Sequence, residues 1–97
     1  MVPNHVVFGK YQELGLINVF GEHLLDPVYK QIIPLHTNPT IIGVRNHQGK
    51  VAIMALDANK IRRISEFEFS FARVEQGIIK VAKGNQFATV SINGEIT

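Results

Sequence analysis

Apolar and polar side chains alternate in several short runs of this chain, and a period of two is typical of a β-strand with one buried face. The clearest run is EFEFSF, in which Phe67, Phe69 and Phe71 are separated by Glu or Ser. We expect the three rings to be buried on one side of a strand, with the polar side chains in solvent. Residues 87–92, FATVSI, show the same alternation.

A second pattern, apolar at every position, fills residues 51–56, VAIMAL. It is expected of a central strand that is covered on both faces. Ala, Met and Leu also favour helices, so a helix over residues 51–64 is the alternative. Turn-forming residues at 57–59, Asp-Ala-Asn, interrupt that segment and favour the strand.

Turn-forming residues separate the apolar runs at regular intervals. Pairs such as Asn93-Gly94 favour tight hairpin turns, because Asn and Gly adopt positive φ readily. Residues 26–40 contain three prolines and are expected to be irregular, with proline confined to edges or loops. About ten short strands joined by such turns predict an all-β fold, an antiparallel meander without helices.

The chain also resembles itself. INVFGE at residues 17–22 and VSINGE at 90–95 match after a shift of 73 residues, and shifts of 36 and 37 relate both segments to the middle of the chain. Periods of this length are typical of repeat folds. We therefore divide the single domain, residues 1–97, into repeats of 36–37 residues: a partial unit 1–14, units 15–50 and 51–87, and a partial unit 88–97.

Partial units at both ends leave open strand edges, and two arrangements would cover them. The strand near residues 88–92 would pair with that near residues 6–8 and close a small barrel or pseudo-ring. Alternatively, the chain forms an open β-repeat array whose half units are completed by other copies.

Residues 14–32, LGLINVFGEHLLDPVYKQI, resemble the bacterial WG repeat. Residues 77–97, GIIKVAKGNQFATVSINGEIT, resemble the following part of that repeat. Leu14-Gly15 takes the place of its aromatic-Gly pair, Gly21 that of its turn glycine, and Pro27 with Tyr29 that of its Pro-aromatic end. The chain has no Trp, and Leu14 replaces the aromatic residue. The resemblance implies a bacterial or phage origin and a binding or scaffolding role, with no catalytic residues to assign.

Composition narrows the function further. The chain has 97 residues, no cysteine and a formal charge of +2, which is too small to indicate a polyanion as partner. Its longest apolar run is six residues, far below the roughly 20 that a membrane helix needs. We expect a cytoplasmic protein without a signal peptide and without membrane association.

Candidate chemistry is sparse, and we expect no enzyme activity, no cofactor and no metal. No serine lies in a nucleophile elbow, and no glycine spacing suits a phosphate loop. Asp57 and Asn59 lack the later ligands of a calcium loop. The four histidines are too widely spaced to supply two metal ligands from one element: His5, His23, His36 and His47.

The strongest charged feature is KIRRI at residues 60–64. Together with two lysines further along the chain it predicts a basic binding strip on a β-surface: Lys60, Arg62, Arg63, Lys80 and Lys83.

The function we expect is a non-enzymatic β-repeat module that binds a protein or assembles into homo-oligomers. The alternatives are a small nucleic-acid-binding β-barrel that uses the strip, and a phage-type inhibitor of a host enzyme.

Overall fold

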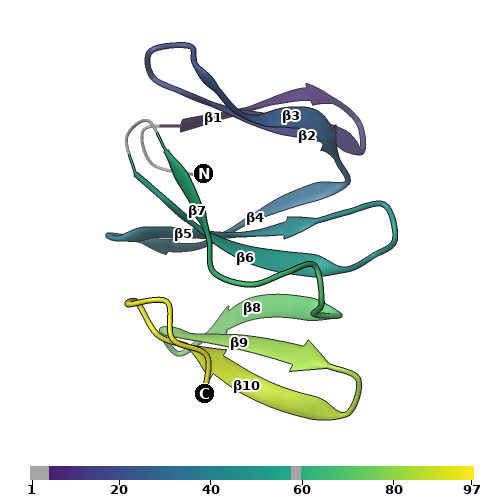
Figure 1. Cartoon of the computed structure of the whole chain (residues 1–97), viewed down its shortest axis with the longest axis vertical. Helices are drawn as coiled ribbons and strands as arrows, with labels where there is room; N and C mark the ends of the chain where they lie inside the picture. Colours follow the sequence, from purple (N-terminus) through teal and green to yellow (C-terminus); the bar gives the residue numbers. More distant parts are fainter. Residues whose placement is uncertain (1–4, 58–59) are drawn as a thin grey trace.

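The computed structural model describes residues 5–57 and 60–97, which form ten β-strands in three antiparallel sheets (Figure 1). The first sheet contains β1 (His5–Lys10), β2 (Glu13–Asn18) and β3 (His23–Tyr29). The middle sheet contains β4 (Gln31–Thr37), β5 (Thr40–Arg45), β6 (Val51–Leu56) and β7 (Ile61–Arg63). The last sheet contains β8 (Phe71–Glu75), β9 (Ile78–Lys83) and β10 (Gln86–Val90). The all-β, antiparallel prediction is confirmed.

The three sheets stack as layers, with the middle sheet between the other two (Figure 1). Side chains alternate along its central strands, so Ile42 and Met54 face the first sheet while Ile41 and Ile53 face the last. The core facing the first sheet consists of Leu16, Leu25, Ile42, Val44, Ala52, Met54 and Leu56. The core facing the last sheet consists of Leu35, Ile41, Val51, Ile53, Phe69, Ala72, Ile79, Val81 and Val90.

This layering explains the run VAIMAL. Residues 51–56 form β6, and both of its faces are buried, as the pattern predicted. The helix alternative for residues 51–64 is wrong, because β6 and β7 pair as antiparallel strands over this segment. The predicted turn residues Ala58 and Asn59 lie outside the described residues.

The EFEFSF segment departs from the prediction. Residues 64–70 form no strand and link β7 to β8, so the three rings do not share one strand face. Phe69 is buried between the middle and last sheets, whereas Phe67 stacks on Tyr29 in the other core with ring centroids 5.8 Å apart. Phe71 begins β8 and is half-buried on the outer side of the last sheet. The alternation fails because the segment passes from one layer to the next.

Residues 26–40 are less irregular than expected, since they contain the end of β3 and all of β4. Among residues 5–57 and 60–97, each of these strands has one hydrogen-bonded neighbour, β2 for β3 and β5 for β4. Pro27 and Pro34 therefore lie on edge strands, where proline removes no ladder hydrogen bond that the sheet needs.

The repeated phrase at residues 17–22 and 90–95 forms the same turn at both places. Asn18 and Ser91 accept side-chain hydrogen bonds from the amides of Glu22 and Glu95, at 3.0 and 3.1 Å. The same turn also occurs at residues 46–50, where the side chain of Asn46 accepts from the amide of Lys50. All three turns have a positive-φ glycine at the fourth position: Gly21, Gly49 and Gly94.

The described strands do not close into a barrel. β1 pairs with β2 and β10 with β9, in different sheets, so residues 88–92 do not pair with residues 6–8. The sheets also divide the chain differently from the predicted units, whose boundaries after residues 14 and 87 fall inside β2 and β10. The C-terminus instead folds back on β10, with the Thr97 amide donating to the Thr89 carbonyl at 2.9 Å.

Candidate binding face on the last sheet

The structure does not bring the five residues of the predicted basic strip together. Lys60, Arg62 and Arg63 lie in or beside β7 of the middle sheet, whereas Lys80 and Lys83 lie on β9 of the last sheet. Because Lys80 and Lys83 are three positions apart in one strand, they also point to opposite faces.

Three of these cations are paired with carboxylates. Arg63 pairs with Glu66 at 3.2 Å and lies over the Phe67 ring, and Lys83 pairs with Glu68 at 3.5 Å. Lys80 pairs with Glu75 at 3.3 Å. Of the predicted strip, only Lys80 lies within the group of residues described next.

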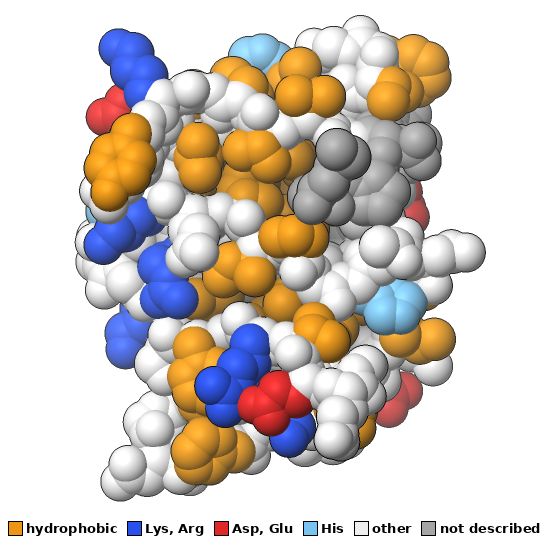
Figure 2. Space-filling view, turned by 180° about the vertical axis from the view of Figure 1, so that it is seen from behind, with side chains coloured by type: hydrophobic (Ala, Val, Ile, Leu, Met, Phe, Trp, Pro, Cys, Tyr) orange, Lys and Arg blue, Asp and Glu red, His pale blue; other side chains and the backbone are white. Residues whose placement is uncertain are grey.

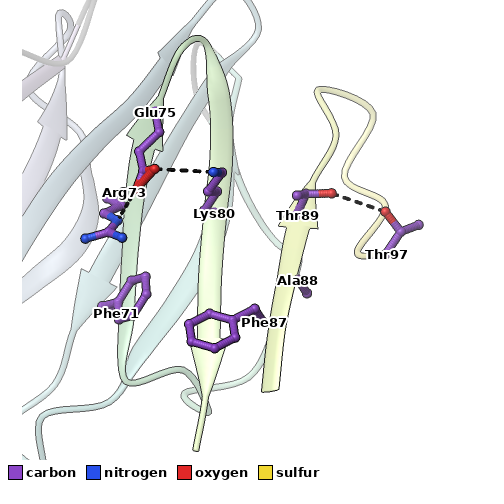
Figure 3. A pocket seen from close by; sticks show the side chains of 8 residues that line it. All are labelled: Phe71, Arg73, Glu75, Lys80, Phe87, Ala88, Thr89 and Thr97. Atoms are coloured by element: carbon purple, nitrogen blue, oxygen red, sulfur yellow. Dashed lines mark hydrogen bonds and ion pairs between the residues drawn. The ribbon is translucent and has the colours of Figure 1, made fainter. Parts of the chain in front are cut away.

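The outer face of the last sheet carries two aromatic rings. Phe71 on β8 and Phe87 on β10 are both opposite Ala82 of β9, and their ring centroids are 6.4 Å apart at an interplanar angle of 50° (Figure 3). Ala82 is buried, whereas 76% of Phe87 remains exposed. The rings therefore cover the centre of the sheet and still present aromatic surface to solvent.

Two cations and one carboxylate continue this face beyond the rings (Figure 3). Arg73 follows Phe71 by two positions in β8, so both side chains point to the same side. The Arg73 guanidinium lies 4.9 Å from the centre of the Phe71 ring, and its Nε donates to Glu75 Oε1 at 2.7 Å. Lys80 on β9 contacts the other oxygen of Glu75 at 3.3 Å.

The pKa of Glu75 lies below its usual value of 4.5, first because Lys80 donates a hydrogen bond to the carboxylate and then because Arg73 places positive charge beside it. The carboxylate is therefore ionised at neutral pH. The group of three charges has a net charge of +1.

The hydroxyls of Thr89 and Thr97 lie 3.3 Å apart at the β10 side of the face (Figure 3). The whole arrangement borders a shallow hollow of about 350 Å³. Its lining consists of Phe71, Arg73, Glu75, Lys80, Phe87, Ala88, Thr89 and Thr97. In the space-filling view, Lys and Arg side chains and an acidic one lie beside apolar side chains at the lower end of the molecule (Figure 2).

This face offers ring surface for stacking, two cationic donors and two hydroxyls, which together suit binding of a planar or anionic group. Among residues 5–57 and 60–97, no three His, Asp or Glu side chains are grouped so that they could hold a metal ion. Within the same residues, no helix is long and apolar enough to cross a membrane.

Sequence patterns did not identify Glu75, Phe87 or Thr89 as members of a site. A signal was present in FARVE, because Phe71, Arg73 and Glu75 alternate and must share one face of a strand. Phe71 was instead assigned to a buried aromatic face together with Phe67 and Phe69.

Comparison with known protein families, characterised proteins and solved structures finds no match to this chain. The resemblance to WG repeats therefore stays a prediction based on residues 14–32 and 77–97.

Proposed function

We propose that this chain is a non-enzymatic β-sheet module for protein binding, in which another copy of the chain is the partner. The observation that carries this proposal is the distribution of exposed large apolar side chains. None of them lies in the middle sheet among the described residues, five lie in the last sheet and the segments joined to it, and six lie in the first sheet and its turns: Val6, Val7, Tyr11, Val19, Phe20 and Val28.

The outer face of the first sheet is the surface we assign to self-association. Leu16 and Leu25 point into the core, so their neighbours in the strands point outward. Val6 is paired with Ile17, and Val28 precedes the inward-facing Tyr29, which places these apolar side chains on the uncovered side. An apolar face of this kind pairs with itself about a two-fold axis, burying the same residues on both copies.

Correspondence between strands supports a repeat origin for the stack. A shift of 36 residues places β1, β2 and β3 on β5, β6 and β7, and a shift of 37 places β4, β5 and β6 on β8, β9 and β10. In this scheme the first sheet corresponds to the middle sheet, and the middle sheet is covered on both faces. Covering its outer face with a second copy gives it the same environment, and the chain then acts as an open β-repeat array in the cytoplasm.

Sedimentation velocity over a concentration series tests the proposal. The parent chain should sediment as a species heavier than its 10.8 kDa monomer, and Val6→Asp should shift it to the monomer because it places a charge in the interface. Ile92→Asp is the matched control: Ile92 is 52% exposed and Val6 53%, but Ile92 lies in the turn after β10. A parent that stays monomeric at every concentration contradicts self-assembly.

A further inference from the structure

We propose that the outer face of the last sheet binds single-stranded nucleic acid, with bases stacked on Phe71 and Phe87 and phosphates held by Arg73 and Lys80. This inference goes beyond the proposed self-association, which uses the opposite end of the stack. It also differs from the predicted basic strip, because it requires neither Lys60, Arg62 nor Arg63.

The first support is the position of the rings. Phe71 and Phe87 extend from the two strands that flank β9, on the face that no other layer covers. Phe87 is exposed enough to accept a planar group, and the Arg73 guanidinium lies over the Phe71 ring, 4.9 Å from its centre. Base–aromatic stacking is tolerant of sequence, because every base presents a π-face.

The second support is the order of side chains along β8. Ring, guanidinium and carboxylate occupy alternate positions of one strand, so the cations begin where the rings end. Lys80 lies beside Arg73 on the neighbouring strand, at the register pair Arg73–Lys80. A strand of nucleic acid with its bases on the rings would carry its phosphates along this pair of cations.

Removing the charge of Glu75 should change binding in a direction that only phosphate binding explains. Its carboxylate contacts both Arg73 and Lys80, so it competes with a phosphate for the same donors and repels it. If the cations bind phosphate, replacing Glu75 by Gln should strengthen binding. If the three charges only hold the strands together, the same change should not improve binding to any ligand.

Fluorescence anisotropy with a labelled eight-nucleotide oligouridylate measures the interaction at low and moderate salt. Phe87→Leu should weaken binding roughly five- to hundredfold, because one stacking ring is lost. Two phosphate contacts predict a slope of log affinity against log salt of about −1.4, and Lys80→Gln should reduce its magnitude by about 0.7. Glu75→Gln should raise the affinity at low salt.

Two control variants separate this face from general effects of charge and apolar surface. Ile92→Ala removes an apolar side chain that is 52% exposed in the turn after β10, and Lys50→Gln removes an exposed cation before β6. Neither should change affinity, and thermal melting confirms that each variant is folded.

Absence of binding at low salt, a weaker complex with Glu75→Gln, or equal effects of Phe87→Leu and Ile92→Ala would overturn the proposal. If the parent chain does not bind the oligonucleotide and Phe87→Leu loses self-association, the outer face of the last sheet binds a protein partner instead.

Discussion

Gly15 is a position at which only hydrogen fits. A β-carbon added there would lie 2.5 Å from the Leu25 carbonyl oxygen and 2.8 Å from the Asp26 carbonyl carbon, which belong to the backbone of the neighbouring strand. The ladder between β2 and β3 shifts register on either side of Leu16, which brings β3 against this glycine. The backbone contact gives the Leu14-Gly15 pair a structural reason that does not depend on any family resemblance.

We expect Gly15→Ala to lower the free energy of unfolding by more than about 2 kcal/mol, because backbone must move to admit the methyl group. Gly43→Ala is the comparison, since a β-carbon there meets side chains only, the nearest being Val51 at 3.2 Å. Urea titration of both variants measures the difference. Equal stability of Gly15→Ala and the parent would contradict the backbone contact.

Phe69 is the buried ring of the EFEFSF segment, with 5% of its surface exposed. Phe69→Ala should destabilise the protein by about 3–5 kcal/mol, through lost burial and the cavity left behind. Ile92→Ala, at an exposed turn position, should change stability by less than about 0.5 kcal/mol. Similar midpoints for the two variants in a denaturant titration would show that Phe69 is not part of the core.

The stability of the folded state should depend on pH through Glu75, and the direction follows from the lowered pKa of its carboxyl. Its contacts with Lys80 and Arg73 stabilise the folded state above the unfolded value near 4.5, and this contribution is lost as pH falls through the lower folded value. In Lys80→Gln the pKa of Glu75 should rise toward the usual value. Carboxyl carbon shifts in an NMR titration report both values, and an unchanged midpoint in the variant would contradict the assigned cause.

Among the elements, the segment between β7 and β8 depends on one serine. Ser65 Oγ accepts a hydrogen bond from the Ile53 amide at 2.8 Å and donates one to the Glu66 carbonyl at 3.0 Å, within a buried site. This side chain continues the edge of β6 after β7 has ended. It therefore fixes the path along which the chain crosses from the middle sheet to the last.

Ser65→Ala should cost about 1–3 kcal/mol, because it leaves the buried Ile53 amide without this acceptor. Ser70→Ala is the matched control: its hydroxyl donates to the Ala82 carbonyl, which also accepts from the Ser70 amide at 2.7 Å. Amide hydrogen exchange should show faster exchange at Ile53 in the first variant only. Unchanged protection at Ile53 would contradict the role of the serine.

Sequence patterns located most strands and turns of this protein because those signals are local. The run at residues 51–56, apolar at every position, predicted a strand between two layers. The alternation at residues 87–92 overlaps β10, which ends at Val90, so Ser91 and Ile92 lie beyond the strand. The turn that begins at Asn18 contains the predicted turn glycine, Gly21. Its recurrence at Asn46, outside the period of 36–37 residues, shows that one turn type alone can make distant segments look alike.

The candidate face on the last sheet was harder to predict, because the exposure of a strand face depends on which other sheet packs against it. Alternation places Phe67, Phe69 and Phe71 on one side only if the strand is continuous, and hydrogen bonds to Ile53 and Val51 show that the chain instead follows the edge of β6 between layers. The basic strip failed for the same reason. Sequence spacing assigned Lys60 and Lys80 to one surface, whereas they belong to different sheets.

At the scale of the whole molecule, the two cores share their central strands. Neighbouring residues of β5 and β6 point into opposite cores, so neither core can lose its packing without exposing strands that the other needs. Leu16→Ala, at a fully buried site in the first core, should cost about 2–5 kcal/mol and lower protection in β9 as well as in β2.

Calorimetry and hydrogen exchange together test this coupling. One thermal transition is expected for the parent and for Leu16→Ala, with amides of the first and last sheets losing protection at the same free energy. Two transitions, or a first sheet that opens while β9 keeps its protection, would contradict the shared-strand argument.

The order of strands determines how such a protein can lengthen by gene duplication. Within the described residues, every strand of a sheet pairs only with strands adjacent to it in the chain, and each link between sheets passes from one layer to the next. An in-frame duplication of one layer would therefore add a complete set of strands without breaking an existing ladder. Genes encoding this architecture can lengthen by tandem copying, and each new layer would arrive with the turns that set its own register.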